Sequence, residues 1–215
     1  MERLKDLVTI LYRPRETMRR ILDQPDRWAP GIVFLAAVCA SANQLDARNL
    51  ADAVPNIKVL PTIAIIALII VLTAATWVIA LYILSWIATP IGRMMGGTGT
   101  VGDVRAGLAW AMVPVIWSPI YRVPLVILAT RSPIVPEINV RKVVIDFLSH
   151  GGCSIIILFL GFQLLFELWC VVLGSFTVAE AQRFSTQKGF VNVVITIALP
   201  LMVMFAAIFT LRKVG

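Results

Sequence analysis

The stretch from Pro61 to Ala88 reads PTIAIIALIIVLTAATWVIALYILSWIA and contains no Asp, Glu, Lys or Arg. About 20 apolar residues are enough for an α-helix to cross the hydrocarbon core of a bilayer, and a longer stretch crosses with a tilt. Because backbone amides find no water in that layer, such a stretch must satisfy its hydrogen bonds internally, as a helix. Residues 61–88 therefore predict a transmembrane helix.

The rest of the chain has the same character. Of its 215 residues, 59% are hydrophobic and only 14% are charged, whereas a soluble domain has about 25% charged residues. Further apolar stretches predict spans at about 29–45, 106–129, 153–174 and 190–211. The predicted fold class is therefore all-α: a polytopic integral membrane protein with five transmembrane helices.

Residues 1–28 form a separate amphipathic segment, which precedes a five-span membrane domain at 29–215. In residues 2–12, Leu4, Leu7, Val8 and Leu11 share one helical face, which predicts a helix lying on the membrane surface. Proline suits the first turn of a helix, so Pro14 predicts the start of a second short helix that ends before Pro25.

Charge gives the orientation. The chain carries a net charge of +7, which suits contact with anionic lipid. Cytoplasmic flanks are enriched in Lys and Arg, and more of these residues are cytoplasmic if the N-terminus is inside. Five spans then place the C-terminus on the outer side of the membrane, which is the periplasmic side if the membrane is a bacterial inner membrane. The same phase puts four tryptophans near the cytoplasmic interface, where indole rings gather: Trp28, Trp86, Trp110 and Trp169.

The loop from Thr89 to Gly107 contains the paired glycines Gly96 and Gly97, which make the backbone permissive. It lacks the Lys-Ser or Lys-Thr ending of a phosphate-binding loop, so we expect a turn between spans. His150 is the only histidine, and the three cysteines are far apart. No catalytic residue, metal site or cofactor is predicted, and an enzyme acting on lipid head groups at this loop is the least favoured class.

Two charged residues, Arg122 and Glu167, fall inside predicted spans, where a charge costs several kcal/mol unless it is paired or hydrated. They could pair or line a polar cavity. Alternatively, Arg122 could extend to the outer interface while Glu167 bonds to a neighbouring helix. Prolines at 114, 119 and 124 also interrupt the third span, and broken helices can mark transport sites. A transporter or channel component with a polar site at Arg122 and Glu167 is therefore the alternative function.

Several motifs resemble the Yip family, the Ypt/Rab-interacting membrane proteins. Gly96 and Gly97 precede VRAGLAWAMVP, from Val104 to Pro114, in the family's order of paired glycine, spacer and proline-containing span. A second match begins at Trp169 and continues through Glu180, and it resembles the turn between the family's fourth and fifth spans. Tyr12-Arg13-Pro14 with Thr17-Met18 resembles the stretch before the first span.

The resemblance implies a five-span fold and a membrane-organising or trafficking-like role, and it supplies no catalytic residues. The long N-terminal region of the eukaryotic members is missing, so the chain resembles the short bacterial branch and no Rab GTPase partner is expected. The leading hypothesis is a non-enzymatic, multi-pass inner-membrane protein. Its expected partners are the lipid bilayer and a second copy or other membrane proteins, and not nucleic acid.

Overall fold

The computed structural model describes residues 2–24, 27–42, 59–121 and 154–214. Within these ranges every regular element is an α-helix. The elements in chain order are α1 (Glu2–Thr9), α2 (Pro14–Leu22), α3 (Ala29–Ala42), α5 (Val59–Met94), α6 (Val101–Trp110), α7 (Val113–Trp117), α10 (Ser154–Gln182) and α11 (Thr186–Val214). The all-helical prediction is confirmed for the described residues.

Three helices are long and apolar enough to cross a membrane, over Ala67–Met94, Gly161–Gln182 and Thr186–Ala207. A shorter apolar helix covers Ala29–Ala40. Only 11% of the most apolar part of α5 and 17% of that of α11 are buried inside the protein. A helix that exposes apolar side chains on all sides requires an apolar surrounding, so these helices belong in lipid.

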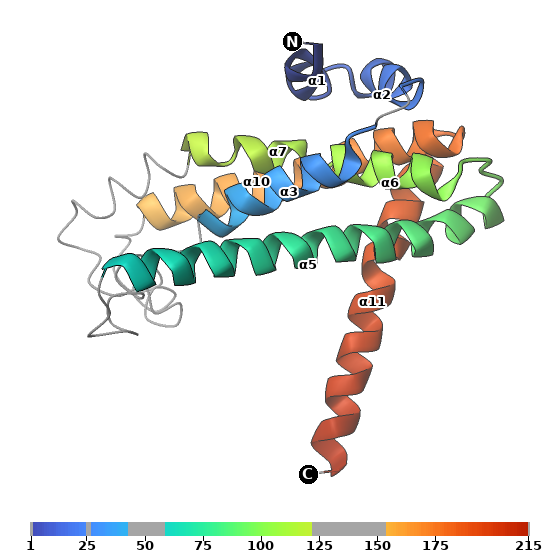
Figure 1. Ribbon diagram of the computed structural model, residues 1–215. Helices are drawn as coiled ribbons and strands as arrows, with labels where there is room; N and C mark the ends of the chain where they lie inside the picture. The colour runs from blue at the N-terminus through green and yellow to red at the C-terminus, as the bar shows by residue number, and fades with distance from the viewer. Residues whose placement is uncertain (1, 25–26, 43–58, 122–153, 215) are drawn as a thin grey trace.

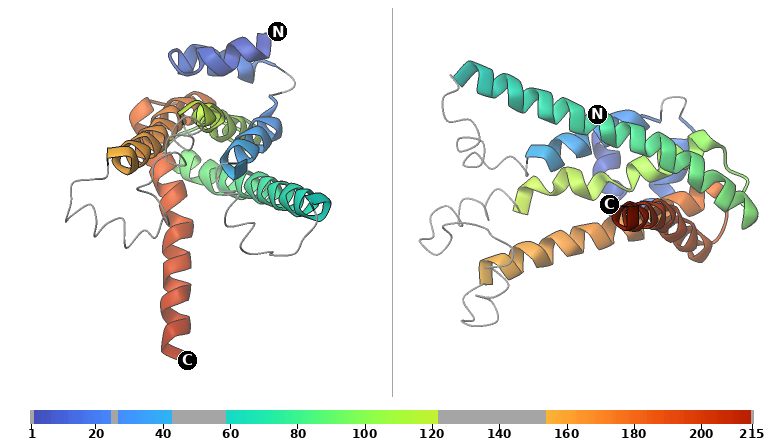
Figure 2. Two further views of the ribbon diagram at one scale, coloured as in Figure 1. Left: turned by 90° about the vertical axis from the view of Figure 1, so that its left-hand side faces the viewer. Right: turned by 90° about the horizontal axis from the view of Figure 1, so that it is seen from below.

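Figures 1 and 2 show α5 and α10 running lengthwise, with α3, α6 and α7 packed along them and α1 and α2 lying across one side. The first half of α11 packs against α10 and α5. Its second half runs crosswise, away from the other helices, and every residue from Leu201 to Ala207 is exposed. The helices are thus packed together at one end of the protein, whereas the second half of α11 is an exposed apolar helix.

Several helices extend beyond the apolar stretches that predicted them. Helix α5 continues through Pro90 to Met94, and α10 continues to Gln182. These extensions include the buried polar residues Thr89 and Gln182 and the charged residues Arg93 and Glu180. Helix α6 begins at Val101, where Thr100 and Asp103 form a reciprocal capping box.

The predicted third span is interrupted, as its prolines indicate. Helix α6 ends at Trp110 and α7 begins at Val113. Pro114 has no amide hydrogen for the helical ladder, which accounts for a break at this point. The later part of this span lies outside the described residues.

Helix α2 begins as predicted, with Pro14 in its first turn. The apolar face of α1 and α2, however, packs partly against the other helices of the protein. Leu7 and Ile10 are buried against the helical domain, together with Met18 and Ile21. Leu4 is 69% exposed, so only part of the predicted face is free. The indole of Trp117 donates to the Leu7 carbonyl at 3.4 Å and further fixes α1.

Trp110 lies at the centre of this core and is 2% exposed. Its indole donates a hydrogen bond to the Arg27 carbonyl at 3.0 Å. The ring is therefore covered by protein and not by lipid head groups, and its predicted depth near the cytoplasmic interface stays a prediction. Trp86, in contrast, is 73% exposed. Trp110 instead joins the segment before α3 to α6.

Candidate functional site

Three segments meet at one end of the bundle, which we call the polar junction: α2, the loop at 95–100, and residues 180–192, which run from the end of α10 into α11. The loop is bound to the other segments through its backbone. Thr98 N donates to Gln182 O at 3.0 Å, and Gly99 N donates to Gln182 Oε1 at 3.2 Å. Lys188 Nζ donates to Met95 O at 2.7 Å. The glycine loop is therefore held in place along its length.

Glycine is required in this loop for two reasons. Gly96 has a φ of +88°, in the left-handed region that favours glycine. At Gly99, a side chain would collide with the backbone of Ala181. These glycines let α5 and α6 approach the end of α10, and they bury the Gln182 side chain completely.

Gln182 is the most deeply buried polar side chain of the junction. Its Oε1 accepts from Gly99, whereas its Nε2 has no hydrogen-bond partner among the described residues. Asn192 is also fully buried and donates to Ala88 O at 3.0 Å. Hydrogen bonds between helices give register to membrane helices, which have no hydrophobic driving force between them. Asn192 thereby fixes α11 against α5.

A carboxylate on α10 holds α2 at the junction. Glu180 is 14% exposed and pairs with Arg19, whose Nε lies 2.5 Å from Oε1, and with Arg15 at 3.7 Å. The side-chain hydrogen bond to Glu180, with its negative charge, raises the pKa of Arg19. Arg15 also donates to the Phe184 carbonyl at 3.4 Å. Glu180 thus binds two cations from a helix that is far away in the sequence.

A second ion pair joins the segment before α3 to the start of α6. Arg27 Nη1 lies 2.5 Å from Asp103 Oδ1, and Thr100 donates to Asp103 Oδ2 from its amide and its hydroxyl. Partial burial opposes ionisation of Asp103. The Thr100 hydrogen bonds and the Arg27 charge outweigh that effect and lower the pKa of Asp103. The carboxylate therefore acts as both helix cap and anchor.

Of the motif residues, Gly96, Gly97 and Glu180 come together in the polar junction. Pro114 lies at the break between α6 and α7 and is buried, and Trp169 is 42% exposed on α10. Arg19, Gln182 and Asn192 were not predicted as site residues. Their partners are distant in the chain, and no local pattern marks such contacts.

Glu167 lies on an exposed face of α10. It accepts a hydrogen bond from Gln163 Nε2 at 2.6 Å, and Gln163 Oε1 accepts one from the Tyr121 hydroxyl at 3.0 Å. Arg122 lies outside the described residues, so its predicted pairing with Glu167 stays a prediction. The described contacts connect Glu167 to the end of the third span through Gln163.

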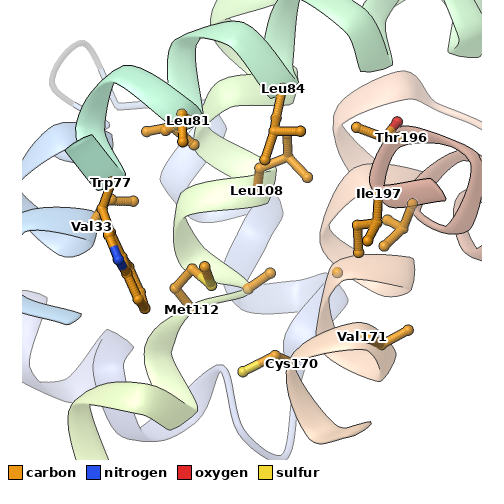
Figure 3. A pocket seen from close by; sticks show the side chains of 14 residues that line it. Val33, Trp77, Leu81, Leu84, Leu108, Met112, Cys170, Val171, Thr196 and Ile197 are labelled. Carbon is orange, nitrogen blue, oxygen red and sulfur yellow. The ribbon is translucent and has the colours of Figure 1, made fainter. Parts of the chain in front are cut away.

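An apolar cavity of about 290 Å³ lies inside the bundle. Figure 3 shows side chains from several helices gathered around it, among them Trp77, Leu108 and Cys170. Thr196 is one of its few polar lining residues, and its hydroxyl is hydrogen-bonded to Asn192 Oδ1 at 3.3 Å. The cavity is therefore large enough for an apolar group but has few polar groups that could bind a polar ligand.

The described residues contain no group of three or more His, Cys, Asp or Glu side chains that could hold a metal ion. What the polar junction can do chemically is to hold helices together through ion pairs and buried amides.

The sequence pattern of the Yip1 domain matches residues 8–208. No curated protein and no solved structure matches the chain. The match spans α5, α10 and α11 as far as residue 208, and it includes the polar junction, the cavity and most of the N-terminal pair. The chain is a membrane protein that belongs to the Yip1 domain family.

Proposed function

We propose that this chain is a non-enzymatic, five-span protein of the bacterial inner membrane with a membrane-organising role. Helices α5, α10 and α11 would supply three spans. Helix α3 and the broken α6–α7 unit would supply two more, each continuing into residues beyond the described ranges. Helix α3 alone has 14 residues, about 21 Å at 1.5 Å per residue, so it needs that continuation to cross about 30 Å of hydrocarbon.

The polar junction is the observation that carries this proposal. Five spans with a cytoplasmic N-terminus put residues 1–28, 89–105 and 175–189 on the same side of the bilayer. The contacts from Arg19 to Glu180, from Arg27 to Asp103 and from Lys188 to Met95 join these three segments. Segments on opposite sides of a bilayer could not touch. The basic side chains gathered there also agree with the enrichment of Lys and Arg on cytoplasmic flanks.

Topology mapping tests the proposal directly. In a background with Cys39, Cys153 and Cys170 changed to Ser, single cysteines are placed at predicted outer positions (Ala51, Ser132 or Gly215) or inner positions (Arg20 or Gln187). A membrane-impermeant maleimide should label the outer set in spheroplasts with an intact inner membrane, and the inner set only after lysis. Labelling of positions 20 and 215 from the same side would refute an odd number of spans.

The alternative role in transport rests on the polar chain from Tyr121 through Gln163 to Glu167. A polar group within a span is a functional-site hypothesis. Solute flux into proteoliposomes that is lost in Glu167→Gln and Arg122→Gln, with folding intact, would favour transport over a purely organising role. Wild-type protein without flux across a broad solute panel would count against it.

A further inference from the structure

The apolar cavity lies among the candidate membrane spans. Its lining residues on α5, from Trp77 to Leu84, fall within Ala67–Met94, and those on α10, from Cys170 to Gly174, fall within Gly161–Gln182. Val193, Thr196 and Ile197 of α11 fall within Thr186–Ala207. Most of the cavity wall therefore belongs to three helices that are apolar enough to cross a membrane.

The break in the third predicted span contributes another wall. Ala111 and Met112, between α6 and α7, line the cavity together with Leu108. Small residues leave the space open, since Ala80, Ala111 and Gly174 stand where larger side chains would fill it. Small side chains at the interfaces of membrane helices usually bring the backbones together. Here they surround a volume instead.

Water is a poor occupant for this volume. A buried water needs two to four polar partners, and the lining residues are apolar except for Thr196 and the Cys170 thiol. The hydroxyl of Thr196 is already bound to Asn192. Leaving the volume empty would sacrifice dispersion contacts along its whole wall. The medium around membrane-spanning helices is hydrocarbon, and it is therefore the available filling.

We propose that the cavity binds an acyl chain of a bilayer phospholipid. Its volume of about 290 Å³ is at the lower end of the roughly 300–1,000 Å³ of ligand pockets. It therefore accepts part of one chain rather than a whole lipid. The inference rests on the proposed placement of α5, α10 and α11 across the bilayer.

The experiment uses a phospholipid with a diazirine near the end of one acyl chain. The full-length protein is reconstituted with this lipid, extracted into detergent, and diluted so that only retained lipid remains before irradiation. Cross-linked peptides of α10 that contain Cys170 and Val171 are then measured by mass spectrometry. Wild-type protein should carry the label at this segment.

Two substitutions on α5 provide a matched comparison. Ala80 lines the cavity, and Ala80→Phe should fill it, whereas Ala75 is exposed and is not among the lining residues, so Ala75→Phe is the control. We expect labelling of α10 to fall at least severalfold, to near background, in Ala80→Phe, because the added ring occupies the volume that the acyl chain needs. It should be unchanged in Ala75→Phe. Leu84→Trp repeats the test from the next turn, in case Ala80→Phe melts at a lower temperature than wild type.

Equal labelling in wild type and both filling variants would overturn the proposal, as would unlabelled wild-type protein. Either result can be distinguished from a failure of the proposed five-span topology, because maleimide labelling tests the topology without a lipid probe. An unlabelled cavity in a protein with the expected topology refutes chain binding alone.

Discussion

Gly189 provides the sharpest test of how α11 is held. It lies in the first turns of α11, and a Cβ built on it would lie within 3.0 Å of the Ser175 carbonyl oxygen and 2.8 Å from Ala179 Cβ. Real Cβ atoms essentially never approach another atom so closely. Since the obstacle is helix backbone and not a flexible side chain, α10 and α11 must move apart in Gly189→Ala.

Gly161, within α10, is the matched control, because a Cβ there would meet nothing within 4 Å. Replacing a helical glycine by alanine gains about 1 kcal/mol from backbone propensity. Gly161→Ala should show this gain alone. In Gly189→Ala the same gain is opposed by overpacking, which typically costs about 1–3 kcal/mol and more when backbone must shift. We expect a net loss of about 1–2 kcal/mol.

Melting temperatures in detergent, followed by fluorescence-detected size exclusion, measure the difference. For a chain of about 200 residues, 1 kcal/mol corresponds to roughly 2–4 °C. Gly161→Ala should therefore melt about 2–4 °C above wild type, and Gly189→Ala about 2–8 °C below it. If Gly189→Ala melted at or above wild type, the close approach of α11 to α10 would be refuted.

Three further predictions follow from the polar junction and the long helices. Because the folded-state pKa of Asp103 is lowered, its contribution should be present above about pH 4 and lost as pH falls through the folded pKa. It amounts to about 0.5–1 kcal/mol at this partly exposed site, so the melting difference between wild type and Asp103→Asn should shrink in acid. A difference that does not vary with pH would contradict this. Glu180→Gln should release α2 and so accelerate tryptic cleavage at Arg19 and Arg20. Glu16→Gln is the control, because it disrupts only an exposed pair with Arg13, and it should not change the cleavage rate. Equal cleavage rates in the two variants would show that Glu180 does not hold α2. In nanodiscs, the distance between spin labels at Ala67→Cys and Ala207→Cys should be shorter than the distance between these residues in the structure. The reason is that α11 must turn toward the direction of α5 when both helices cross one bilayer. An unchanged distance would show that one of these helices does not span the membrane.

The sequence predicted the helices well because the bilayer sets a simple rule. A charge-free stretch such as 61–88 has few alternatives to a helix, and Pro14 and Pro114 mark a start and a break through the chemistry of their rings. The face of α1 could not be assigned in the same way. Leu7 has the same hydrophobicity whether it covers lipid or the protein core, and only tertiary packing distinguishes the two.

The polar junction illustrates the other limit. Glu180 and Gly96 were selected as motif residues, but their roles depend on Arg19, which is 161 positions from Glu180, and on Lys188 Nζ, which lies near Gly96. The cavity was invisible to the sequence for the same reason, since small residues from separate helices create it together. Pairing of Arg122 with Glu167 stays a prediction.

Hydrophobicity places these helices in the bilayer, but it does not choose which of their faces meet, because lipid tails are as apolar as leucine. That choice must come from features that lipid cannot imitate: close backbone approach and buried hydrogen bonds. Both are concentrated at the polar junction, where Gly99 and Gly189 admit neighbouring backbone and Asn192 bonds across to α5. Farther along, at Trp77, Val171 and Ile197, no such feature is present among the lining side chains and the helices leave a cavity. Specific packing at the polar junction and the apolar cavity farther along the helices are therefore two consequences of the same physical condition.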